Sequence, residues 1–128
     1  MIKLICGRSR AGKTTYSQRF EDVIHLDLCG GVLACYDHAL EKVAKANGDV
    51  IIEGVYNTVE RRMALLNAYK GNGNRVCVWI DTDLETIGNR TFDRIPKPRL
   101  FEPPTLDEGW DEIIIIRGDD EQRINRQR

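Results

Sequence analysis

Residues 7–15, Gly-Arg-Ser-Arg-Ala-Gly-Lys-Thr-Thr, have types and spacing that suggest chemistry. They match the pattern G-x-x-x-x-G-K-[ST], with Gly7, Gly12, Lys13 and Thr14 at the defined positions. The glycines allow the backbone to approach a ligand closely. Successive backbone N–H groups can then face the oxygens of an anionic phosphate. The stretch therefore predicts a phosphate-binding loop between a strand and a helix.

Every residue of this loop is a candidate for contact with a nucleotide. Lys13 is expected to reach the β- and γ-phosphates of ATP, and the Thr14 hydroxyl is expected to hold Mg²⁺. The motif leaves the side chains of Arg8 and Arg10 free to touch phosphate or to point into solvent. The expected cofactors are thus ATP and Mg²⁺, and the candidate contacts are Gly7, Arg8, Ser9, Arg10, Ala11, Gly12, Lys13, Thr14 and Thr15.

The elements that must position this loop follow from the apolar pattern. Five short apolar runs alternate with helix-like stretches, and three of the runs carry continuous β-branched residues, as strands buried on both faces do. This alternation is typical of an α/β protein whose parallel sheet is covered by helices. The predicted strands are residues 2–6, 22–27, 49–54, 75–81 and 112–117, and the predicted helices after the loop helix are 32–47, 59–70 and 83–92.

Several finer expectations concern single segments. The helix at 59–70 is expected to bury Val59, Met63 and Leu66 on one face. His25 is expected to pack along the second strand. The polar tail at 118–128 is predicted to be a solvated helix or a frayed end.

Composition narrows the class of protein. The chain has 128 residues, which favours one domain, and its net charge of −1 gives no strong field toward nucleic acid or membrane. No apolar run approaches the ~18 residues of a membrane span. A secretion signal is not apparent. The four cysteines lack a C-x-x-C pairing, and Cys6 and Cys77 lie in apolar runs. Reduced cysteines of this kind favour a cytoplasmic setting.

A phosphate-binding loop does not fix the reaction, because ATPases, GTPases, transport motors and small kinases share it. The sequence contains no N-K-x-D guanine signature and is too short for the added subdomains of motor ATPases. A compact kinase is therefore favoured.

Beyond the loop, four segments resemble the polynucleotide 5′-hydroxyl kinase group of P-loop kinases. They are IHLD at 24–27, VIIEGVYNTVERRMALL at 50–66, DTDLETIGNRTFDRI at 81–95 and RLFEPPTLDEGWDEIIII at 99–116. The resemblance implies a single three-layer P-loop kinase domain over 1–128, with a short lid at about 89–104. It also implies a five-stranded, mostly parallel sheet of order 2-3-1-4-5 with helices on both faces. The implied activity is phosphoryl transfer from ATP to a hydroxyl acceptor.

The resemblance assigns a role to Asp27, and the residue pattern adds two further acidic candidates outside the loop. Asp27, at the end of the second strand, would accept the proton of the attacking hydroxyl, although an N-cap or a ligand of Mg²⁺-bound water is also compatible with its position. Glu53 ends the third apolar run, where an acidic residue can orient Mg²⁺-bound water. The alternative for Glu53 is a surface turn residue. Asp81 is a weaker acidic candidate.

Arginines supply the remaining candidates. Arg90 and Arg94 are four residues apart, so they share a helix face and could neutralise charge on the transferring phosphoryl group, unless that face is simply solvated. Arg61 and Arg62 could meet an acceptor phosphate, but an exposed helical pattern is favoured for them.

Two departures from the family pattern leave the acceptor open. Gly54, Val55 and Tyr56 stand where the family has aspartate, threonine and asparagine, and the segment after Arg94 is short. The acceptor can be a 5′-hydroxyl of nucleic acid, a nucleoside-like compound or a small metabolite alcohol. A nucleotide-binding regulatory module with little kinase activity is the further alternative.

Overall fold

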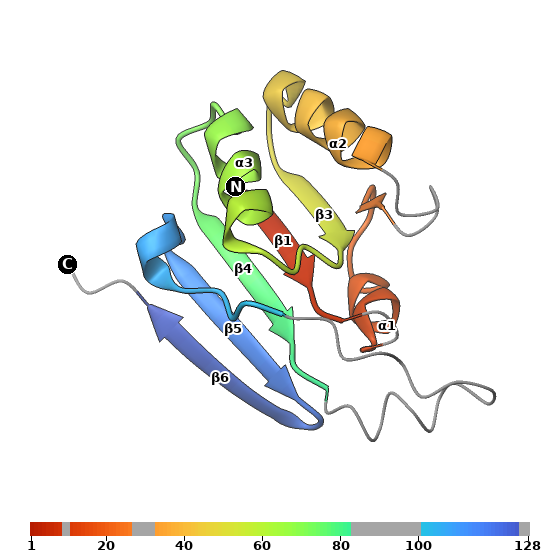
Figure 1. Cartoon of the computed structure of the whole chain (residues 1–128), viewed down its shortest axis with the longest axis vertical. Helices are drawn as coiled ribbons and strands as arrows, with labels where there is room; N and C mark the ends of the chain where they lie inside the picture. Colours follow the sequence, from red (N-terminus) through yellow and green to blue (C-terminus); the bar gives the residue numbers. More distant parts are fainter. Residues whose placement is uncertain (9–10, 27–32, 83–100, 126–128) are drawn as a thin grey trace.

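The structure is a computed structural model that describes residues 1–8, 11–26, 33–82 and 101–125. Within these residues the chain forms six strands and three α-helices (Figure 1). The elements are β1 (Ile2–Cys6), α1 (Lys13–Ser17), β2 (Ile24–His25), α2 (Leu33–Lys45), β3 (Val50–Gly54), α3 (Val59–Ala68), β4 (Arg75–Ile80), a 3₁₀ turn at Leu106–Glu108, β5 (Glu112–Arg117) and β6 (Asp120–Asn125). No helix in the described ranges is long and apolar enough to cross a membrane.

The strands form one mixed sheet in the order β2-β3-β1-β4-β5-β6. The first five strands in this order are parallel to their neighbours, and β6 is antiparallel to β5. Cys6, the last residue of β1, lies beside Gly54 of β3 and Trp79 of β4. The carboxyl ends of these strands therefore meet at the edge where the phosphate-binding loop begins. The predicted α/β class with a mostly parallel sheet is confirmed.

The prediction for the C-terminal tail is wrong, and the sheet has six strands where five were expected. Asp120–Asn125 form β6, which pairs along the whole of β5. Gly118 adopts a positive φ of 60° in the connecting turn, a conformation that glycine reaches without a steric penalty. Only Ile124 of β6 is apolar, and it pairs with Ile113. Backbone pairing, which leaves little trace in the sequence, thus forms this strand.

Alternating side chains of the strands build a core layer on each face of the sheet. On β1, Leu4 and Cys6 belong to the layer under α2 and α3, whereas Ile5 belongs to the layer next to α1. On β5, Ile113 and Ile114 divide between the two layers in the same way. Strands buried on both faces explain why these apolar runs are continuous.

The buried face of α3 differs from the predicted one. Met63 is 39% exposed, and the buried side chains of the helix are Arg62, Leu65 and Leu66. The face is rotated because the arginine turns inward to a buried carboxylate, Glu108, instead of remaining in solvent. An arginine in a core position cannot be recognised from hydrophobic periodicity.

Candidate nucleotide-binding site

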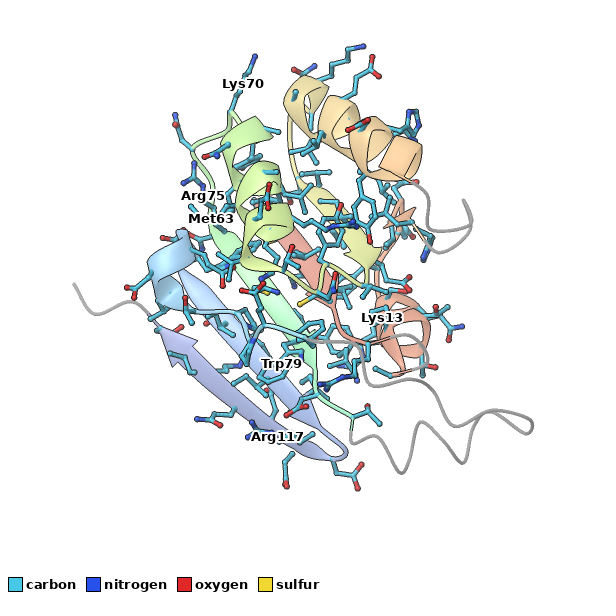
Figure 2. All side chains as sticks on the ribbon, in the orientation of Figure 1. Lys13, Met63, Lys70, Arg75, Trp79 and Arg117 are labelled. Atoms are coloured by element: carbon cyan, nitrogen blue, oxygen red, sulfur yellow. The ribbon has the colours of Figure 1, made fainter. Side chains whose placement is uncertain are left out.

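The loop predicted to bind phosphate joins β1 to α1 at the carboxyl edge of the sheet, and Figure 2 labels Lys13 at the start of that helix. Gly7 is required by close packing, because a Cβ there would lie 2.7 Å from the carbonyl oxygen of Ile80. Gly12 has a φ of 107° and caps α1, a backbone conformation that other residues rarely adopt. Glycine is therefore required at position 7 by close packing and at position 12 by the backbone conformation.

Two basic side chains of the loop, Lys13 and Arg8, make contacts in the structure. Lys13 is buried, and its Nζ donates to the carbonyl oxygen of Arg8 at 2.8 Å. The guanidinium carbon of Arg8 lies 5.8 Å from the centre of the Phe101 ring. Two positive side chains are thus held at the loop, where phosphate charge would have to be balanced.

Glu53 of β3 connects this loop to the neighbouring strands. Its side chain is 1% exposed, so the alternative of a surface turn residue is wrong. Thr14 Oγ1 donates to Glu53 Oε1 at 3.0 Å, and Ser17 Oγ donates to Oε2 at 3.2 Å. His25 Nδ1 also hydrogen-bonds to Oε2, so the histidine faces this carboxylate from β2. Three polar partners offset the cost of burying the carboxyl group.

The residues present fit a bound Mg²⁺ ion. The Thr14 hydroxyl and the Glu53 carboxylate are hydrogen-bonded to each other, and both carry oxygen atoms that can serve as metal ligands. Mg²⁺ prefers oxygen ligands. In the described parts of the chain, no three or more His, Cys, Asp and Glu side chains cluster as a metal site. Mg²⁺ usually completes its coordination with water and substrate phosphates, so one hydroxyl beside one carboxylate meets its protein requirement.

An open cavity of about 640 Å³ lies beside the loop. The loop and α1 form one wall, and Ile80, Thr82, Ile116 and Gly118 form part of the other. Thr82 Oγ1 donates to the carbonyl oxygen of Ala11 at 2.5 Å and so joins the two walls. Cavities of roughly 300–1,000 Å³ hold small ligands and cofactors. The sequence did not predict the wall at Gly118, because it belongs to the unexpected β5–β6 turn.

Asp81, the weaker acidic candidate, has a different environment. Its Oδ2 accepts from Arg117 Nε at 2.8 Å, an ion pair at the end of β4 and β5. Glu53, not Asp81, is therefore the acidic residue that contacts the loop threonine.

A buried ion pair between Arg62 and Glu108 joins α3 to the segment at 101–110, and Arg62 also holds the backbone that follows β3. Arg62, which was expected to be exposed, is 0% exposed and donates from Nε to Glu108 Oε1 at 2.8 Å and from Nη2 to Oε2 at 3.2 Å. Its Nη1 donates to the carbonyl oxygen of Tyr56 at 2.8 Å. Trp110 Nε1 donates to the same carboxylate at 3.2 Å. The FEPPTLDEGW segment is thereby fixed to α3.

This ion pair sets the backbone beside the phosphate-binding loop. Tyr56 has a φ of +40°, which is unusual for a bulky residue and requires support from its surroundings. Val55, its neighbour, accepts from the Gly7 N–H at 3.4 Å. Arg62 therefore supports the backbone that contacts the loop, and the ERR pattern, which favoured an exposed helix face, did not reveal this contact.

Five predicted site residues lie outside the described part of the chain: Ser9, Arg10, Asp27, Arg90 and Arg94. Thr15 is exposed and lines the cavity next to Lys13 and Thr14. The structure thus brings together Lys13, Thr14 and Glu53 of the predicted set. No protein family and no curated protein sequence matches this chain.

Proposed function

We propose that this protein is a kinase that transfers the γ-phosphoryl group of ATP to a hydroxyl acceptor in a Mg²⁺-dependent reaction. The contact of Thr14 with the buried Glu53 carries the proposal, because it joins the two protein ligands that a nucleotide-bound Mg²⁺ ion would need. The observed sheet order and the loop after β1 are compatible with a three-layer P-loop kinase fold.

Each described residue has a defined task in this proposal. The backbone N–H groups of the loop and the start of α1 bind phosphate oxygens. Lys13 donates a hydrogen bond to the Arg8 carbonyl oxygen in the structure. When ATP binds, Lys13 donates to phosphate oxygens instead and balances their charge. Bound Mg²⁺ supplies charge neutralisation at the β- and γ-phosphates. Glu53 holds the Thr14 hydroxyl and supplies the negative charge that a cation requires.

The acceptor half of the proposal rests on the family resemblance. Asp27 orients the acceptor hydroxyl and takes its proton as the new O–P bond forms, while the bond between the γ-phosphorus and the β–γ bridging oxygen breaks and ADP leaves. Arg90 and Arg94 stabilise the charge on the transferring phosphoryl group from the lid. Phosphoryl transfer depends mainly on positioning and electrostatics, so these few groups suffice for the reaction.

The replacement Asp27→Asn tests this division between ATP binding and transfer. The variant should keep the Mg·ATP affinity of the wild type, measured by calorimetry, and lose phosphoryl transfer by about 10²–10⁴-fold. Asp22→Asn is the matched control, since Asp22 is exposed and asparagine tolerates its positive φ of 56°. Full activity of Asp27→Asn would show that Asp27 does not take the proton of the acceptor hydroxyl. Mg·ATP binding by the wild type without transfer to any hydroxyl would favour a regulatory nucleotide-binding module instead.

A further inference from the structure

A second cavity, of about 380 Å³, lies between α2 and α3. Its volume is near the lower end of the roughly 300–1,000 Å³ found for small-molecule sites. Leu40 of α2 and Ala64 of α3 form an apolar part of the cavity wall. Tyr36 and Tyr56 form an aromatic part. A cavity of this size and lining suits one ring system.

The aromatic wall is ordered by contacts between its own members. The rings of Tyr36 and Tyr56 meet edge to face, with centres 5.2 Å apart and an interplanar angle of 83°. The guanidinium carbon of Arg61 lies 4.1 Å from the centre of the Tyr36 ring. Aromatic and guanidinium groups of this kind bind planar rings by stacking.

Tyr56 adds a hydrogen-bonding group that the fold itself does not use. The residue is 1% exposed, and its hydroxyl has no hydrogen-bond partner within the described residues. Burial raises the pKa of this hydroxyl, so the group stays protonated and can both donate and accept. An unpartnered buried hydroxyl costs stability, and because this atom is fully buried, a ligand can supply a partner only if the Tyr56 ring or its neighbours shift.

The backbone around Tyr56 is arranged to keep the ring in place. Gly54 leaves room for it, because a Cβ there would lie 3.0 Å from the Tyr56 ring. Arg62 holds the Tyr56 carbonyl oxygen in the left-handed conformation described above. Tyr56 also directly follows Val55, which contacts Gly7 of the phosphate-binding loop. One residue of the cavity wall therefore directly follows a residue that contacts the phosphate-binding loop.

The charged lining of the cavity indicates what kind of ring it takes. Asp37 and Glu60 contribute two exposed carboxylates, and Arg61 contributes one guanidinium. Among the described lining residues the formal charge is therefore −1, which favours an uncharged ligand over a polyanionic strand.

We propose that this cavity holds the non-reacting ring of the acceptor, which is therefore a small, uncharged alcohol bearing a planar aromatic or heteroaromatic ring. The inference rests on the proposed kinase function, which requires a hydroxyl acceptor near the phosphate-binding loop. A shift of the Tyr56 ring that opens its hydroxyl to the cavity would favour rings that carry a polar atom, because such an atom completes its hydrogen bonding.

Ligand-observed NMR tests this assignment in the presence of Mg²⁺ and a saturating non-hydrolysable ATP analogue, which keeps the probes out of the nucleotide site. The probes are cytidine, tyrosol, 3-pyridinemethanol, benzyl alcohol and, as a non-planar comparison, cyclohexylmethanol. The planar probes should bind the wild type, and cyclohexylmethanol should bind at least about tenfold more weakly because it cannot stack.

Three variants locate the binding. Ala64→Leu fills the cavity and should raise the Kd of the planar probes at least about tenfold. Asn67→Leu adds a leucine at an exposed position of the same helix outside the cavity, and it should leave each Kd unchanged. Tyr56→Phe should weaken the probes with polar ring atoms and leave benzyl alcohol unchanged. Thermal unfolding of Tyr56→Phe should match or exceed that of the wild type, because no bond of the hydroxyl is lost.

The outcomes separate this inference from the kinase proposal. The inference is overturned if no planar probe binds, if Ala64→Leu leaves binding unchanged, or if a 5′-hydroxyl oligonucleotide binds equally well to the wild type and Ala64→Leu. In each of these cases, ATP-dependent transfer to another hydroxyl would leave the kinase function standing. Phosphorylation of a planar probe that Ala64→Leu abolishes, but Asn67→Leu does not, would support both.

Discussion

Glu53 is the residue that links sequence motif and structure most directly. A buried carboxylate is costly unless hydrogen bonds compensate it, and Thr14, Ser17 and His25 all contact this one. Thr14 and Ser17 both belong to α1, and Thr14 is also part of the phosphate-binding loop. The carboxylate therefore orients the hydroxyl proposed to bind Mg²⁺, in addition to its place in the fold.

The replacement Glu53→Gln tests that role without a change of shape. It removes the negative charge and keeps an oxygen that can accept from Thr14, so the fold should persist by circular dichroism. Affinity for Mn²⁺ in the presence of ATP, measured by electron paramagnetic resonance, should fall by about 10–100-fold. Glu41→Gln, at an exposed position of α2, should leave this affinity unchanged. Equal Mn²⁺ affinity in Glu53→Gln and the wild type would contradict the assignment.

Gly7→Ala tests the close approach of the loop to β4. The added methyl group meets the Ile80 carbonyl oxygen, so the loop must shift, at a cost of about 1–3 kcal/mol in unfolding free energy. ATP binding should weaken because the backbone N–H groups move with the loop. Gly48→Ala is the control, since nothing lies within 4 Å of the place that its added methyl group would take. Urea unfolding and calorimetry with ATP measure both effects, and equal values for the two variants would contradict this reason for Gly7.

Some single residues could be assigned from the sequence and others could not. Lys13 and Thr14 belong to a spaced motif, and Glu53 ends a buried run, so local pattern was sufficient to select them. Arg62 and Tyr56 acquire their roles from partners far along the chain or from an unusual φ. No local pattern encodes those contacts.

Among the elements, α3 is held by a buried long-range ion pair. Its arginine, Arg62, pairs with Glu108, and the same carboxylate accepts from the Thr105 N–H at 2.9 Å. The Glu108 carboxylate therefore connects the 3₁₀ turn to α3, and hydrophobic periodicity gives no sign of such a charged contact. The apolar stripe predicted for this helix was displaced for that reason.

Arg62→Met should destabilise the fold strongly, because it leaves the Glu108 carboxylate buried without its ionic partner. The expected loss is about 3–5 kcal/mol in the free energy of unfolding by urea. Lys45→Met breaks an exposed pair with Glu41 and should change stability little. Similar unfolding midpoints for Arg62→Met and the wild type would show that the buried pair does not hold this segment.

The β5–β6 hairpin is the element that the sequence did not reveal. The predicted run at 112–117 was correct for β5, but β6 has the pattern of a solvated segment because nearly all its side chains are exposed. Its charged residues, Asp120, Glu121 and Arg123, also suit an edge strand that must avoid pairing with other chains.

Removal of β6 should therefore expose β5 to such pairing. A chain ending at Arg117 leaves the backbone groups of the isoleucine-rich strand open and should form larger species by size-exclusion chromatography with light scattering. A chain ending at Asn125 retains both strands and should elute as the full chain does. If the chain ending at Arg117 has the same assembly state as the full chain, β6 does not protect this edge.

At the scale of the whole molecule, the two cavities belong to opposite faces of the sheet. The larger one is lined by Ala11, Ile80 and Ile116, which pack in the layer next to α1. The smaller one is lined by Tyr36 and Tyr56, which pack with the layer under α2 and α3. The phosphate-binding loop lies at the strand ends between these layers. The proposed donor and the proposed acceptor would thus approach the loop from different sides of the sheet.

The central claim is that this loop delivers the γ-phosphoryl group of ATP to a hydroxyl. The most direct measurement incubates γ-labelled ATP and Mg²⁺ with 5′-hydroxyl oligonucleotides, nucleosides and ring-bearing alcohols, and then follows the label. With the wild type and the exposed-site control Lys45→Ala, label should appear on an organic acceptor. Lys13→Ala should reduce that transfer by about 10²-fold or more, because a phosphate-binding charge is lost. Label that stays on ATP, or that appears only as inorganic phosphate, would contradict the claim.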